Sequence, residues 1–170
     1  MVVDGEVATD YPTSNGFPLS LEGGVLRGIG VIDVNVQNGG IVAPGSSAGI
    51  LTIARLYTQT ASGALSIEIG GLAAGTEYDR LAVGGVATLD GTLRVEFVNG
   101  YVPNVGDHFT IMTYPSKVGN FSDMILPRLS RGKIVEVAVG DTELVVSISS
   151  KARPIAALNV VEAFIDAFIP

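Results

Sequence analysis

Carboxylates form the clearest group of residues in this sequence whose types and spacing suggest chemistry at a site. Glu77, Asp79 and Asp90 lie close together in the chain, and one residue separates the first two. Two carboxyl groups a few ångströms apart can hydrolyse a glycosidic bond, one as the acid and the other as base or nucleophile. Asp79 also stands where a strand pattern begins, and a carboxylate there can equally cap a turn. We therefore take these three residues as candidates for binding or cleaving a carbohydrate.

Other catalytic and metal-binding patterns are incomplete. The single histidine, His108, has no cysteine in the chain to help it bind zinc, so such a site would need several carboxylates. Gly28 and Gly30 lack the third glycine and the helix of a dinucleotide-binding fingerprint. No row of aromatic residues, which often stack on sugars, stands beside the carboxylates. The sequence predicts a protein that is not an enzyme and that has no cofactor and no metal.

The composition excludes several classes of protein. With 47% hydrophobic and 16% charged residues, the chain is too apolar for intrinsic disorder, and without cysteine it has no disulfide framework. The net charge of -7 argues against nucleic acid as a partner, because such binding depends on Lys and Arg. No apolar run reaches the roughly 20 residues of a membrane-spanning helix. Residues 1–6 lack the basic and apolar regions of a signal peptide.

Alternation of apolar with small or polar residues dominates the chain from residue 23 to residue 149. In 63–69, Leu65, Ile67 and Ile69 alternate with Ser66 and Glu68. This period of two is typical of strands with one buried face, and glycine-rich turns separate one such stretch from the next. Many short strands without helical patterns between them predict an all-β fold.

Two details distinguish between all-β architectures. The inward residues are aliphatic and similar in size, and a Gly-x-Leu pattern recurs at Gly49, Gly63 and Gly91. Both favour a parallel β-helix, or β-solenoid, in which equivalent residues stack on one another. An antiparallel β-sandwich or jelly roll is the alternative, because short alternating strands and glycine turns are typical of it too.

An ordered series of motifs adds a resemblance to a known class of protein. The series is GGVLRGIGVIDVNVQNGGIVAPGSSAGILTI (23–53), LYTQTASGALSIEIGG (56–71), EYDRLAV (77–83) and GTLRV (91–95). It resembles the β-helical stalk segments of autotransporter passengers and adhesin-like secreted bacterial surface proteins, over residues 23 to about 122. The resemblance implies a right-handed parallel β-helix at residues 23–150, an extracellular or cell-surface location, and a role as stalk or display scaffold without catalytic residues. We expect residues 1–22 to be an N-terminal extension or first rung.

The period changes near the C-terminus. Residues 154–169 predict a helix with proline in its first turn, within a C-terminal unit at 151–170. Its polar residues form one narrow stripe, and the apolar face comprises Leu158, Val161, Phe164, Ile165 and Phe168. Such a face either caps an open end of the fold or packs against a second copy of the chain.

Three functions follow from these patterns. The first is a non-catalytic structural or interaction module, a stalk or display scaffold joined to neighbouring domains of a longer chain. The second is a self-assembling fibre or appendage subunit that associates through its C-terminal helix. The third is a carbohydrate-binding or polysaccharide-cleaving β-helix with a glycan as its partner.

Overall fold

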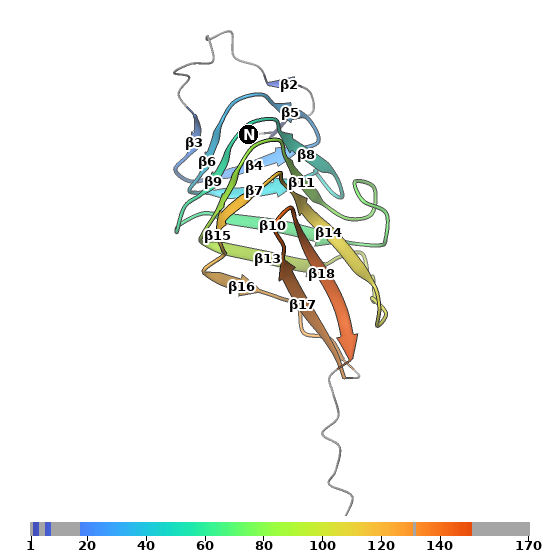
Figure 1. Cartoon of the computed structure of the whole chain (residues 1–170). Coiled ribbons are helices and arrows are strands. Elements are labelled where there is room, and N and C mark those ends of the chain that lie inside the picture. Colours follow the sequence, from blue (N-terminus) through green and yellow to red (C-terminus); the bar gives the residue numbers. More distant parts are fainter. Residues whose placement is uncertain (1, 4–5, 8–17, 131, 151–170) are drawn as a thin grey trace, which may run out of the picture.

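The computed structural model describes residues 2–3, 6–7, 18–130 and 132–150, and every regular element within them is a β-strand (Figure 1). The strands form three sheets. The first sheet contains β1 (Val2–Val3), β4 (Val25–Gly28), β7 (Ile41–Pro44), β10 (Ala64–Ile69), β13 (Thr92–Phe97) and β16 (Asp123–Ile125). The second contains β2 (Glu6–Val7), β5 (Val31–Ile32), β8 (Ile50–Ile53), β11 (Arg80–Val83), β14 (His108–Thr113), β18 (Glu143–Ser150) and β17 (Lys133–Val139). The third contains β3 (Leu19–Leu21), β6 (Val36–Asn38), β9 (Tyr57–Gln59), β12 (Ala87–Leu89) and β15 (Lys117–Gly119).

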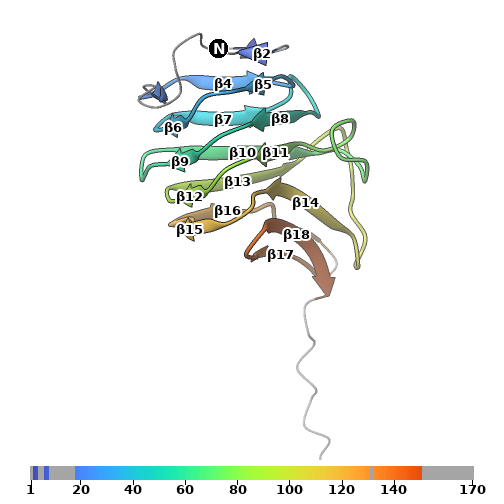
Figure 2. The ribbon, with the colours of Figure 1, turned by 45° about the horizontal axis from the view of Figure 1, so that its top comes forward.

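The chain visits the three sheets in turn, so each strand from β1 to β13 has the third strand after it as a neighbour in its sheet. We call one strand from each sheet, taken in chain order, a three-strand unit; successive units lie one above the other in Figure 2. Every pair up to β16 is parallel. The predicted all-β fold is confirmed. The alternative of an antiparallel sandwich is wrong for these strands, because parallel neighbours need crossover connections rather than hairpins.

Equivalent inward residues stack into columns that make the core. In the first sheet Val42 lies between Leu26 and Leu65, and the column continues to Leu93; all four are fully buried. In-register parallel pairing places aliphatic side chains of similar size on one another, and full burial of each contributes about 1.5–3 kcal/mol. The aliphatic inward face predicted from the alternation is therefore the core.

The corner between the third and first sheets is closed by glycines and amides. A Cβ on Gly63 would lie 2.2 Å from the carbonyl oxygen of Asn38, and a Cβ on Gly91, whose φ is +63°, would lie 2.3 Å from the carbonyl oxygen of Gly63. Asn38 Nδ2 donates to Tyr57 Oη at 3.0 Å, and the Tyr57 hydroxyl donates to Gln59 Oε1 at 2.8 Å. These buried bonds satisfy polar groups where the chain turns too tightly for a ladder.

The repeat interval grows along the chain. The column Val25, Ile41, Ala64, Thr92 and Asp123 has successive intervals of 16, 23, 28 and 31 residues. From β5 onward, each connection from the second sheet to the third has three residues, as in 33–35 and 54–56. The connection from the first sheet to the second instead lengthens from 29–30 to 70–79 and 98–107. Only Gly63 and Gly91 of the three Gly-x-Leu patterns share a column, because Gly49 precedes β8 of the second sheet.

The two ends of the stack differ. Strands β1, β2 and β3 occupy one end of their sheets, and β15, β16 and β17 occupy the other, so the chain progresses from end to end (Figure 2). At the second end β18 pairs antiparallel with both β14 and β17. Within residues 18–130 and 132–150 no helix is long and apolar enough to cross a membrane. The helix predicted at 154–169, with its face of Leu158, Val161, Phe164, Ile165 and Phe168, lies outside the described residues.

Candidate functional site

The three carboxylates chosen from the sequence lie at two different corners of the fold. Asp90 stands between β12 and β13, where the third sheet turns into the first. Glu77 and Asp79 belong to the connection from the first sheet to the second, before β11. Asp90 accepts hydrogen bonds from the Ser122 hydroxyl and from the Gly91 amide, at 2.7 Å for the amide, and these bonds hold the pKa of its carboxyl below the usual value. Asp90 therefore stabilises its own turn.

Glu77 also stabilises the loop to which it belongs. Its Oε2 accepts the backbone amides of Leu72 and Ala73 at 2.8 and 2.9 Å, and its side chain lies beside Gly71. The carboxylate thereby satisfies amides that the 70–79 connection leaves without backbone partners. This role explains the position of Glu77 without a ligand.

Asp79 is buried and joins β10 of the first sheet to the connection that precedes β8 of the second. Only 2% of its surface is exposed; Oδ1 accepts the Gly49 amide and Oδ2 accepts the Glu68 amide, both at 2.9 Å. Burial raises the pKa of its carboxyl to about 7, and the nearby charge of Glu68 acts in the same direction, whereas the two amide bonds oppose the shift. A carboxyl with this pKa changes its charge near neutral pH.

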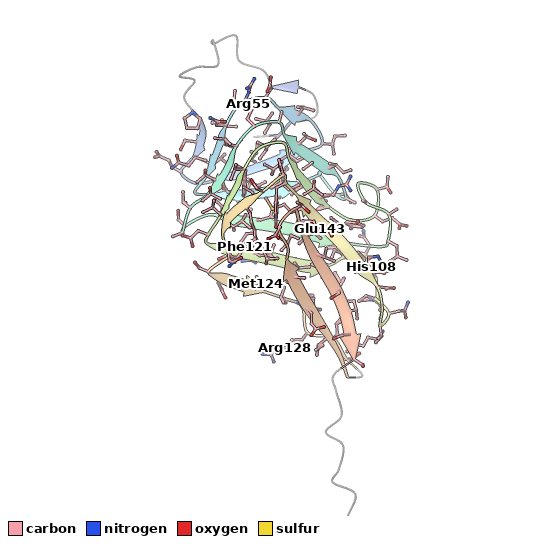
Figure 3. The ribbon with its side chains drawn as sticks, in the orientation of Figure 1. Arg55, His108, Phe121, Met124, Arg128 and Glu143 are labelled. Atoms are coloured by element: carbon pink, nitrogen blue, oxygen red, sulfur yellow. The ribbon has the colours of Figure 1, made fainter. Side chains whose placement is uncertain are left out.

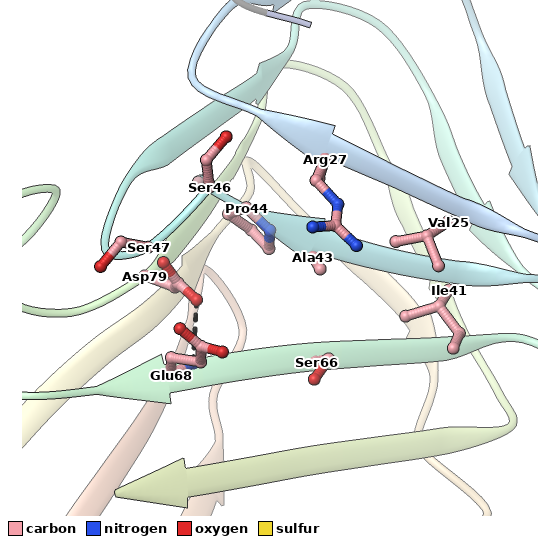
Figure 4. Close-up of a pocket in the computed structure, with 11 residues that line it drawn as sticks. Val25, Arg27, Ile41, Ala43, Pro44, Ser46, Ser47, Ser66, Glu68 and Asp79 are labelled. Carbon is pink, nitrogen blue, oxygen red and sulfur yellow. Dashed lines mark hydrogen bonds between the residues drawn. The ribbon is translucent and has the colours of Figure 1, made fainter. Parts of the chain in front are cut away.

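Asp79 lines a hollow of about 250 Å³ on the outer face of the first sheet (Figure 4). Parallel register places Ala43 beside Arg27, and on β10 Ser66 comes one residue after Leu65, which pairs with Val42. Because Ala43 and Ser66 are small, they leave space between the Arg27 side chain and the Glu68 and Asp79 carboxyl groups, as Figure 4 shows. The loop 44–47 forms one wall of the hollow.

The hollow can bind a small polar group. The exposed Arg27 supplies charged donors, Ser66 supplies a hydroxyl, and the half-buried Glu68 supplies a carboxylate acceptor. The volume is below the range of about 300–1,000 Å³ for small-molecule pockets, which suits one ring-sized group. Because both oxygens of Asp79 accept backbone amides, Asp79 is not free to act as a nucleophile beside Glu68. The arrangement therefore suits binding better than cleavage.

Sequence reasoning missed Arg27 and Glu68 as site residues. The alternation in 63–69 does place Ser66 and Glu68 on the outward face, which the structure confirms. What the sequence did not reveal is that β4, far away in the chain, lies two strands from β10 in the same sheet.

His108 belongs to none of these contacts. It is exposed at the start of β14, away from β4 and β10 (Figure 3), and its Nδ1 lies 3.4 Å from the carbonyl oxygen of Gly106. Across the part of the chain that the structure describes, no three side chains of His, Cys, Asp or Glu come together as metal ligands do.

Comparison with known proteins adds no relative to this description. The chain matches no family model, and a search of curated proteins found no match.

Proposed function

We propose that the chain is a right-handed parallel β-helix that serves as a non-catalytic stalk or display scaffold of an extracellular bacterial surface protein. One observation carries the proposal: strands pair in parallel with the third strand after them, and the chain progresses from one end of the stack to the other. Handedness, export and surface location rest on the resemblance of residues 23–122 to stalk segments.

This arrangement suits a spacer because length follows directly from the number of units. Neighbouring strands lie about 4.8 Å apart, so the five steps between the six strands of the first sheet span roughly 24 Å. Opposite ends of the stack hold β1 and β16, so domains joined there would be kept apart. Buried aliphatic columns and three-residue corners make the spacing rigid.

Duplication of one unit tests the architecture. A second copy of residues 64–91 inserted after Gly91 should add one strand to each sheet and increase the separation of the two ends by about 5 Å. Fluorophores on Ser20→Cys and Asp141→Cys, in a chain without native cysteine, report that distance by energy transfer. The control inserts 28 Gly and Ser residues into the 98–107 loop and should leave the distance unchanged. An equal distance in both insertions would refute the stacked architecture.

Presentation of a fused reporter on the cell surface tests the proposed role as a display scaffold. With a signal peptide and a surface anchor added, a reporter fused to the chain should be reached by an antibody outside the cell. A folded chain whose reporter stays inside the cell would refute the exported scaffold. Sedimentation velocity at increasing concentration distinguishes the fibre alternative, because fibre subunits grow into filaments whereas a scaffold of single chains does not.

Carbohydrate binding is a second candidate, favoured by the hollow between Arg27 and Glu68. Glu68→Gln should weaken any glycan captured on an array by about tenfold, since it removes a charged acceptor. Glu96 pairs in register with Glu68 on the next strand and is exposed, so Glu96→Gln is the matched control. Equal loss in both variants, or no glycan captured by the wild-type chain, would exclude the hollow as a carbohydrate site.

A further inference from the structure

The core has an apolar surface at the end of the stack where β17 lies. Val135, Val137 and Val139 pair with the buried residues of β18 and extend its inward face, yet they are only half-buried. Among the described residues, Met124, Leu126 and Leu129 also pack against the core while remaining partly exposed. This end therefore presents apolar side chains that the described strands do not cover.

A hollow of about 490 Å³ lies beside this surface. Leu129, Lys133 and Val135 line it together with Arg128, whose side chain projects at the same end of the molecule (Figure 3). A second hollow, of about 270 Å³, shares Leu129 and Lys133 and adds Val102, which is 71% exposed. The two hollows extend the apolar end toward the 98–107 loop.

The last described residue of the chain, Ser150, lies beside this apolar surface. In the antiparallel pair of β17 and β18, Ser150 lies opposite Lys133, at the rim of both hollows. The sequence 151–170 follows directly. Residues 154–169 have the length of a helix of about 24 Å, which matches the roughly 20–25 Å of a seven-residue strand.

We propose that residues 154–169 of the same chain cover this apolar end, with Leu158, Val161 and Phe164 against the half-buried valines of β17. The occupant is the chain's own segment rather than a second copy, because a short link after Ser150 gives it a millimolar effective concentration. Coverage also protects β17, which has β18 as its one paired neighbour among the described strands and would otherwise present a free edge. The inference goes beyond the proposed stalk role and does not depend on it.

Cross-linking in the full chain tests the proposal. Val137→Cys with Phe164→Cys, treated at low protein concentration with a short bis-maleimide, should give a cross-link within one chain. The control pairs Val137→Cys with Glu162→Cys, two positions away on the polar stripe, and should give at least fivefold less product. Equal yields would overturn the proposal, and a predominant product between chains would show that a second copy occupies the surface instead.

A second measurement applies if the cysteine variants fail to fold. Ile165→Asp in the full chain should increase hydrogen exchange of β17 amides at least tenfold, because a charge in the covering face opposes docking. Asn159→Asp adds the same charge on the polar stripe and should leave the exchange unchanged. Equal exchange of β17 amides in wild type and Ile165→Asp would overturn the proposal.

Discussion

Asp79 should make the stability of the fold depend on pH in an unusual direction. Its pKa is 3.8 in the unfolded chain and about 7 in the fold, so folding takes up a proton between these values. The stabilisation is fully present below pH 4 and is lost as pH rises toward 7. The free energy of unfolding should fall by about 1.4 kcal/mol per pH unit, or about 4 kcal/mol over the window.

Urea unfolding at several pH values between 4 and 8, followed by circular dichroism, measures this loss. Asp79→Asn stays neutral at every pH, so the difference in unfolding free energy between wild type and variant isolates the carboxyl. Wild type should lose about 4 kcal/mol relative to the variant across the window. Glu96→Gln, an exposed carboxylate on the neighbouring strand, should follow the wild-type curve in parallel.

A constant difference between wild type and Asp79→Asn would refute the reasoning. It would mean that the amides of Gly49 and Glu68 hold Asp79 ionised despite its burial. Glu68→Gln provides an internal check, because removal of the neighbouring negative charge should lower the pKa of Asp79 and end the fall at a lower pH.

Three further substitutions test the columns and the tight corner, with urea unfolding as the measurement. Gly63→Ala should cost about 2 kcal/mol or more because its Cβ meets a backbone oxygen, whereas Gly23→Ala has open space and should be nearly neutral; equal effects would contradict the close approach. Asn38→Ala should cost about 2 kcal/mol by leaving buried polar groups unpaired, and an unchanged stability would argue against that network. Leu65→Ala should cost about 3 kcal/mol and the exposed Leu72→Ala less than about 0.5 kcal/mol, so similar values would refute the core assignment.

Local alternation was sufficient to identify strands and their buried faces. Leu65, Ile67 and Ile69 are fully buried on β10, and Ser66 and Glu68 point outward, as the sequence predicts. This succeeds because the two faces of a strand are set by neighbouring residues, whatever sheet the strand joins.

Which strands pair with one another could not be predicted from local alternation, because pairing depends on residues far apart in the chain. A fixed period would have revealed the parallel columns, but the connection from the first sheet to the second lengthens along the chain and hides it. The site was missed for the same reason. Arg27 and Glu68 share a hollow because β4 and β10 both pair with β7, whereas Glu77 and Asp90, which the sequence placed with Asp79, hold turns.

Progress of the chain from one end of the stack to the other has a mechanical consequence. Tension applied at the two ends acts along the hydrogen bonds between units and loads the outermost strand first, so strands detach one after another rather than together. Release of one unit, such as the 28 residues from Ala64 to its partner Thr92, adds up to about 95 Å of extended chain at roughly 3.4 Å per residue. Under load the protein should therefore lengthen in steps, one unit at a time, once the force exceeds the strength of the bonds that hold the outermost strand.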